Sequence, residues 1–331
     1  MNDIPNHVSP PYTDDARDDA LFHYTSAAGL IGILRAKELW ATAYYCSNDA
    51  SELAVGRGFL TPELTRITRK MIDDGDPLVL TFLKRGVNPM EYAENFEQLV
   101  VETAFSLLST YISCFCKPKG EEDFRHGLLS QWRAYGADGG YALQFSRKKL
   151  LEAIEKIENE KGGWAYDLKD VFYATQNPLQ DKVLGHIDVF IQAYNDHLKA
   201  FGGPLEALLN TSTMPSPIAG LVGGPLEALL DYFIHTKNGH FSEERECRLS
   251  FVEPEAPDLQ KIPTDCFDRG GLIVPYKRIP HSTIPLVDCL EWILIGPNSR
   301  MGARFKSVCQ IVKASGLDIK VRPSHIPFVR S

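Results

Sequence analysis

Residues typical of β-strands gather near the two ends of this chain, and the middle has a mainly helical pattern. Residues 147–160 and 178–238 form this helical part. The β-prone runs comprise a first strand that ends at His23 and the segments 39–45, 111–116, 141–145, 247–252, 271–275, 292–295 and 319–322. A sheet made of such strands has to join distant segments. We therefore expect an α+β fold with one domain over residues 21–331 and a helical insertion around residues 178–238.

Further helices are expected between the strands. Ser26 is a suitable N-cap for a helix over residues 27–36. Asp49 and Glu52 have the spacing of a capping box and predict another helix start. The remaining predicted helices cover residues 62–74, 90–108, 128–135 and 300–315, whereas the charged residues 117–125 are expected to form a loop.

One eight-residue segment occurs twice in the helical middle. Gly202–Leu209 returns letter for letter as Gly223–Leu230, which is a period of 21 residues. Two copies are too few for a solenoid. A local duplication that forms a surface insertion or an additional helix is the simpler interpretation.

The charge and the cysteine content indicate which partners and which cellular setting to expect. The net charge is −8, and no dense stripe of Lys and Arg occurs, so the pattern favours a small-molecule, nucleotide or protein partner over tight nucleic-acid binding. The acidic residues 1–20 are expected to be a flexible leader, and no apolar run reaches the roughly 18 residues of a membrane span. Seven cysteines without a CxxC pair predict a reduced, cytoplasmic setting and no zinc site.

Two polar clusters are candidates for chemistry. His23 ends the first expected strand beside Tyr24 and Thr25, although a single His at a strand end is more often structural. At the other end of the chain, strand alternation would place Glu244, Glu246 and Arg248 on one face. The alternative for this second cluster is a solvated Glu/Arg pair at the start of a strand.

Two aromatic residues form a third candidate. Trp132 and Tyr135 are three residues apart and share one face of a predicted helix. They could stack on a base or a nicotinamide ring, although such pairs more often cover a core.

Taken together, these segments resemble a bacterial family known as domain of unknown function 2971. The resemblance covers roughly residues 20 to 300. Its motifs are Phe22–Ser26, Leu39–Thr42, Asn48–Asp49 with Glu52, Ser113–Phe115, Trp132–Gly136 and Glu244–Leu249.

A more distant similarity is to the ADP-ribosyltransferases, which carry a His or Arg on the first core strand, a Ser-x-Ser or Tyr motif on a middle strand and a Glu before a later strand. His23, Ser113 and Glu246 resemble these three positions, but Cys116 stands where a hydroxyl is often found. The resemblance implies a split, mainly antiparallel β-sheet core and NAD as the substrate. It also implies that Glu246 stabilises an oxocarbenium-like centre and that Glu244 orients or deprotonates the acceptor.

The same resemblance implies an NAD-binding set, in which His23 bonds the adenosine-side ribose. The other members are Tyr24, Thr25, Ser113, Trp132, Tyr135 and Arg248. We therefore expect an NAD-consuming ADP-ribosyltransferase or NAD glycohydrolase, as a toxin or phage-defence effector, with a protein or nucleic-acid acceptor. The alternatives are a non-catalytic nucleotide-sensing or protein-binding module of the same fold and a nuclease-like effector.

Overall fold

The computed structural model describes residues 10–47, 52–84, 86, 88–91, 94, 108–135, 140–160, 165–174, 230–254, 262–279 and 284–327. The repeated segments 202–209 and 223–229, the start of the helix expected at Asp49 and almost all of the helix expected at 90–108 lie outside these residues. So does most of the helical insertion predicted around residues 178–238.

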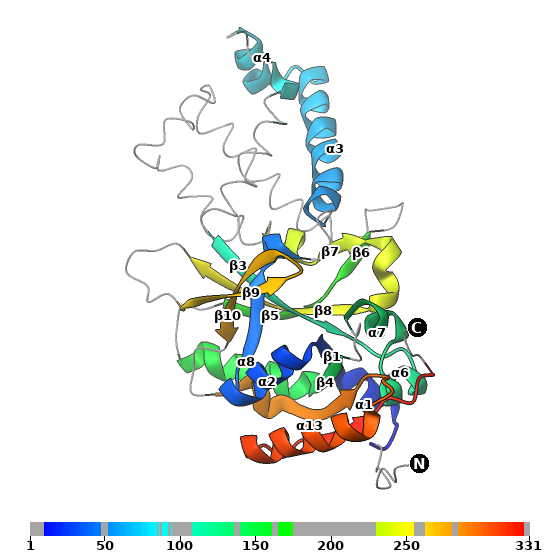
Figure 1. Ribbon diagram of the computed structural model, residues 1–331. Coiled ribbons are helices and arrows are strands. Elements are labelled where there is room, and N and C mark those ends of the chain that lie inside the picture. Colours follow the sequence, from blue (N-terminus) through cyan, green and yellow to red (C-terminus); the bar gives the residue numbers. More distant parts are fainter. Residues whose placement is uncertain are drawn as a thin grey trace.

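The chain forms an α+β structure around a mainly antiparallel sheet (Figure 1). Its ten strands are β1 (Ala20–Thr25), β2 (Leu39–Ala43), β3 (Leu108–Cys116), β4 (Tyr141–Ser146), β5 (Ala165–Asp170), β8 (Glu246–Pro254), β9 (Thr264–Arg269), β10 (Leu272–Ile279), β11 (Leu290–Ile295) and β12 (Lys320–Pro323). β6 (Phe172–Ala174) and β7 (Thr236–Asn238) form a separate parallel pair.

The strand order follows β12-β11-β4-β1-β3-β2-β10-β9, with β8 and β5 joined to β3 as a branch. Along one edge of β3, Cys116 pairs with Phe22 of β1 and Ile112 pairs with Thr42 of β2. Along the other edge, β8 pairs with all nine residues of β3. The sheet therefore divides at β3, because β1 and β2 share one of its edges and separate from each other there.

Helices cover both faces of the sheet (Figure 1). On one face, α2 (Ala27–Ala36), α8 (Arg147–Glu160) and α13 (Met301–Ser315) bury their apolar sides against strand residues such as Leu143 and Leu249. On the other face, α6 (Glu121–His126) and α7 (Leu129–Tyr135) pack over Phe22 and Trp292. The expected helix over residues 27–36 is confirmed, and the Ser26 hydroxyl accepts the Gly29 amide as its N-cap.

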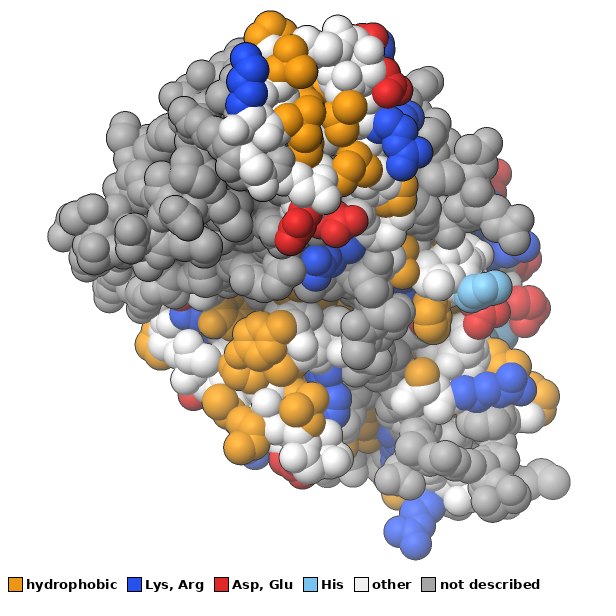
Figure 2. Space-filling model, turned by 90° about the horizontal axis from the view of Figure 1, so that it is seen from above, with side chains coloured by type: hydrophobic (Ala, Val, Ile, Leu, Met, Phe, Trp, Pro, Cys, Tyr) orange, Lys and Arg blue, Asp and Glu red, His pale blue; other side chains and the backbone are white. Residues whose placement is uncertain are grey.

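A long helical arm extends from this body. α3 (Glu52–Asp73) leads away from the sheet, and α4 (Pro77–Lys84) lies at its far end (Figure 1). Figure 2, which looks down on that end, shows hydrophobic side chains grouped between charged ones. Leu80 and Leu83 of α4 are exposed large hydrophobic residues.

Several elements differ from the sequence-based expectations. Residues 117–125 were expected to form a loop, but Glu121–His126 form α6, which buries Phe124 and starts with three acidic residues suited to a helix N-terminus. Strands β5, β6, β7 and β9 were not predicted, and Thr236–Asn238 is strand within a region expected to be helical. Within the stretch expected to be a leader, α1 (Asp14–Asp19) is a short helix capped by Thr13.

Candidate functional site

Motifs from the beginning and the end of the sequence lie on three adjacent strands, β1, β3 and β8. Phe22 of β1 pairs with Cys116 of β3, and Cys116 pairs with Glu246 of β8. These three residues therefore form one row across the sheet at the position where β8 begins. β1 and β8 do not pair directly, because β3 lies between them.

His23 is the residue of β1 after Phe22, and it lies at the position where β1 separates from β3. Its Nδ1 lies 3.0 Å from the carbonyl oxygen of Cys114, and because a carbonyl only accepts, Nδ1 carries the proton. The neutral ring then presents Nε2 as an acceptor. Burial lowers the pKa of His23, although the hydrogen bond to Cys114 opposes this effect, so the ring is neutral at pH 7. The ring centroid lies 5.7 Å from that of Phe115.

Ser113 does not share the face of Glu246. Successive strand residues point to opposite faces, and Ser113 pairs with Leu249 whereas Cys114 pairs with Arg248. The Ser113 hydroxyl donates to the carbonyl oxygen of Trp40 at 2.7 Å. By the same alternation, His23 follows Phe22 and lies on the face of Phe115 and Ser113, opposite to that of Glu246. The backbone and thiol of Cys114 lie between His23 and Glu246.

Glu246 is buried in a network of opposite charges. Arg248 donates from Nε to Oε1 at 2.7 Å, and the Nζ of Lys237 donates to Oε2 at 2.9 Å. Lys237 also donates to Glu244 at 2.8 Å, so one ammonium group joins the two carboxylates. Only 4% of Glu246 is exposed, which excludes the solvated ion pair that was the alternative for this cluster. The expected alternation is confirmed from Glu246 onward, because Cys247 and Leu249 enter the hydrophobic core on the opposite face. Glu244 does not belong to the strand: it ends a 3-10 helix over Gly239–Glu244 and reaches the cluster through Lys237.

Electrostatics fix the charges in this network. Burial alone would raise the pKa of Glu246, but Arg248, Lys237 and a hydrogen bond from Cys114 outweigh it and hold the pKa at about 2. Burial opposes the charged form of Lys237, yet Glu246 and Glu244 raise its pKa above the usual value. The Glu246 carboxylate and the Lys237 ammonium are therefore both ionised at neutral pH.

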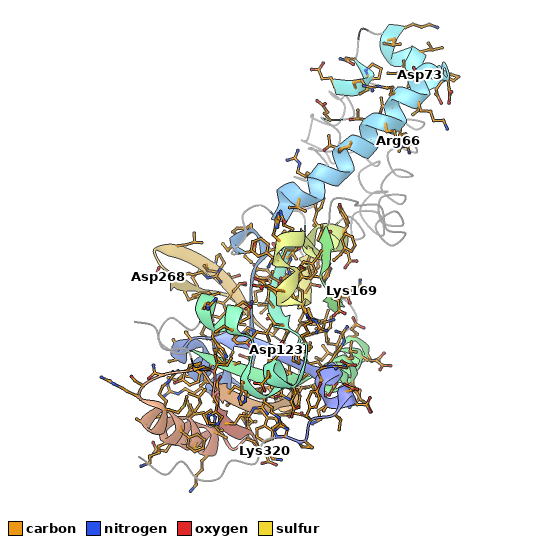
Figure 3. All side chains as sticks on the ribbon, turned by 90° about the vertical axis from the view of Figure 1, so that its right-hand side faces the viewer. Arg66, Asp73, Asp123, Lys169, Asp268 and Lys320 are labelled. Atoms are coloured by element: carbon orange, nitrogen blue, oxygen red, sulfur yellow. The ribbon has the colours of Figure 1, made fainter. Side chains whose placement is uncertain are left out.

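The backbone of Glu246 is also anchored. Its amide donates to the hydroxyl of Tyr173 at 2.7 Å, and its carbonyl accepts from the amide of Val171. Lys169, labelled in Figure 3, lies beside the segment that carries β7 and forms an ion pair with Asp231 at 3.0 Å. The small β6–β7 sheet therefore positions Lys237 against the start of β8.

The predicted aromatic ligands are mostly occupied in the core. The Tyr24 hydroxyl accepts the Leu128 amide at 2.7 Å, and its ring lies 4.9 Å from that of Trp132 in an edge arrangement. Trp132 is 1% exposed and donates to the carbonyl oxygen of His126. Both residues pack the face under α6 and α7, while Thr25 is half-buried at the end of β1. The side chain of Tyr135 lies outside the described residues.

Sequence reasoning missed three members of this site. Cys114 links His23 to Glu246, because its carbonyl oxygen accepts a hydrogen bond from His23 and its thiol forms a hydrogen bond with Glu246. Lys237 and Tyr173 were also missed, since both lie on short strands of three residues without an alternating pattern. The one available signal was the excess of acidic residues at 243–246, which predicts a nearby cation.

Residues 131–249 match the model of a family described as "Protein of unknown function (DUF2971)". This match supports the resemblance to the DUF2971 family. The DUF2971 match includes Trp132, Glu244, Glu246 and Arg248, and it begins after His23 and Ser113. No curated protein and no solved structure matches the chain.

The residues that the structure describes contain neither a membrane-spanning helix nor a metal-binding cluster. None of the helices there has the length and apolar character needed to cross a membrane. Within the same ranges, no group of three or more His, Cys, Asp and Glu side chains could hold a metal ion.

Proposed function

We propose that the protein is an NAD-consuming ADP-ribosyltransferase or NAD glycohydrolase. The observation that carries the proposal is the adjacency of β1, β3 and β8, the three strands on which His23, the Ser113–Cys116 motif and Glu246 lie. About 220 residues of sequence separate the first strand from the last, so the order of motifs alone did not require them to meet. This arrangement supports one NAD site beside the start of β8, at the position where β1 separates from β3, which His23 and Glu246 would reach from opposite faces of the sheet.

The proposed reaction breaks the bond between nicotinamide and ribose. The bonding electron pair leaves with nicotinamide, and a water molecule or an acceptor nucleophile on a protein or nucleic acid then bonds to the ribose carbon and loses a proton. A carboxylate that is anionic at neutral pH can stabilise the positive charge developing on the ribose, and Glu246 meets this requirement. The neutral His23 ring offers Nε2 as an acceptor for a ribose hydroxyl.

The remaining residues have supporting roles in this proposal. Glu244 is 23% exposed in its side chain, so it is the more accessible of the two carboxylates and suits contact with an acceptor. Thr25 would contribute to NAD binding directly, and Arg248 would contribute by holding the Glu246 carboxylate in place. The protein would act as a toxin or phage-defence effector inside the cell. Tyr24 and Trp132 act through packing, because their polar atoms already have partners.

The test measures nicotinamide release when purified protein is incubated with NAD and candidate acceptors. We expect release by the wild type and a loss of at least about 100-fold in Glu246→Gln, since removing one electrostatic contributor in an active site typically costs that much. Absence of release by the wild type with protein and nucleic-acid acceptors present would contradict the proposal.

Glu253→Gln is the matched control. Glu253 lies on the same strand, is 2% exposed and forms its own buried ion pair with Lys277. Both substitutions therefore remove a buried carboxylate charge from β8, and only one changes the proposed site. Equal losses in the two variants, at equal folded fractions, would show that Glu246 acts through stability.

A second candidate function is a non-catalytic module that senses nucleotides or binds protein. One observation favours it: both oxygens of Glu246 already bond cationic groups of the chain itself, from Arg248 and Lys237. A buried, neutralised carboxylate of this kind is also common in purely structural networks. If NAD binds with a measurable Kd to the wild type and to Glu246→Gln alike, and neither releases nicotinamide, the module is the correct interpretation.

A further inference from the structure

A second charged group lies deep in the structure, away from the candidate NAD site. Arg322 of β12 is 2% exposed and extends over the sheet face that α6 covers. Its Nη2 donates to the carbonyl oxygen of Phe124 and to the side-chain oxygen of Gln144, both at 2.7 Å. Figure 3 labels Asp123 and Lys320, which mark α6 and β12.

The guanidinium of Arg322 has aromatic rings beside it. Its central carbon lies 5.0 Å from the ring centroid of Trp292 and 5.6 Å from that of Phe124. Tyr12, Ala16 and Ile326 pack against the same cluster from the two ends of the described chain. These contacts stabilise a cation only in part, because ring faces and neutral oxygens carry no net negative charge.

In the part of the chain that the structure describes, no acidic group compensates this charge. Among the described residues Arg322 forms no ion pair, and its Nε and Nη1 are buried without a hydrogen-bond partner. Burial, together with the nearby Arg125 charge, lowers the pKa of Arg322 to about 9, so the group is still charged at neutral pH. A buried, unpaired charge is costly, as are buried donors without acceptors.

We propose that Arg322 is the centre of a buried binding site for a small monovalent inorganic anion, with chloride as the representative ligand. One guanidinium charge needs one negative charge, and a dianion would leave a surplus among neutral and aromatic neighbours. The free Nε and Nη1 donors supply the contacts. A guanidinium is weakly hydrated and the enclosure is largely aromatic, so anions that lose water readily bind best: bromide exceeds chloride, and chloride exceeds fluoride.

The first experiment follows thermal unfolding of the full chain at constant ionic strength while sodium gluconate is replaced by sodium chloride. Because the anion binds only the folded state, the Tm of the wild type should rise by roughly 2 °C at about ten times the Kd. Arg322→Met removes the charge but keeps an unbranched side chain, and its Tm should not respond to chloride. Lys320→Met is the control, since Lys320 lies on the same strand and also contacts Trp292, but is exposed.

The second experiment reads the site directly and does not depend on whether the Arg322 variant folds. Bromide bound beside Arg322 should quench the fluorescence of Trp292 with a saturable component that chloride removes by competition. The chain has four tryptophans, and Trp292→Phe should abolish only that component. A linear, unsaturable quench in the wild type, or an equal chloride response in wild type and Arg322→Met, would show that Arg322 binds no anion.

Discussion

At the scale of single residues, β8 buries two glutamates that face different partners. Glu246 bonds Arg248 and Lys237, and Glu253 bonds Lys277 and the Ile262 amide. Removing one member of such a pair leaves an uncompensated charge, whereas the complete pair contributes little net stability. The carboxylates therefore make the start and the end of β8 sensitive to substitution, and the lowered pKa of Glu246 makes the start of β8 sensitive to pH as well.

The Glu246→Gln variant should show this sensitivity in the pH dependence of unfolding. The pKa of Glu246 falls from 4.5 to about 2 on folding, so the folded state binds fewer protons and its advantage exists above pH 4.5. That advantage, on the order of 3 kcal/mol, is lost as the pH falls toward 2. Denaturant unfolding should therefore show a large stability gap between wild type and variant at pH 7, which narrows at pH 3.

Asp14→Asn is the control for that series, because the Asp14 carboxylate is 79% exposed on α1. Its stability gap to the wild type should be small at pH 7, because an exposed ion pair contributes little to stability. A gap between wild type and Glu246→Gln that stays constant from pH 7 to pH 3 would contradict the role assigned to the Arg248 and Lys237 charges.

At the scale of elements, α6 has a glycine at each end, and the two glycines differ in their surroundings. Gly127 ends the helix at φ 78°, where a side chain is strained, and an added Cβ would lie 2.9 Å from Trp132 and from the Tyr24 hydroxyl. Gly120 precedes the helix at φ −155°, with open space around its Cα. Close contact with Trp132 therefore requires glycine only at the C-terminal end.

The two glycines allow a matched test by denaturant unfolding. Gly127→Ala should lower the free energy of unfolding by about 2–4 kcal/mol, because backbone strain and overpacking add. Gly120→Ala should change it by less than about 1 kcal/mol. Equal effects of the two substitutions would show that α6 tolerates movement away from Trp132.

At the scale of the whole molecule, the sheet and the helical arm differ in how far tertiary packing stabilises them. β1, β3, β4 and β8 are each paired along both edges, and helices cover both faces of the sheet. α4 is only eight residues long and lies at the end of α3, far from the sheet (Figure 1). Local opening of the arm should therefore cost much less free energy than opening of the central strands.

Amide hydrogen exchange followed by mass spectrometry tests this difference. Peptides from β3 and β8 should exchange last, on the scale set by global unfolding, and peptides from α4 should exchange first among the helices named here. The edge strand β9, which pairs only with β10 among the described strands, should exchange between them. Equal protection in α4 and β3 would contradict this order.

The sequence by itself determined the local elements with strong patterns. Ser26 predicted the start of α2, and the alternation after Glu246 predicted which residues of β8 enter the core; both are confirmed. These features depend on a few consecutive residues and on the period of a helix or a strand. The acidic first turn of α6 and the three-residue strands β6 and β7 lack such a period and were missed.

Only the tertiary structure decided which residues meet. The branch at β3 places His23 and Glu246 on either side of Cys114, turns the Ser113 hydroxyl to Trp40 and brings Lys237 between two carboxylates. It also buries Arg322 without an acidic partner among the residues described. Strand register and burial set these contacts, and both depend on the pairing of strands that are distant in the sequence, which no local pattern specifies.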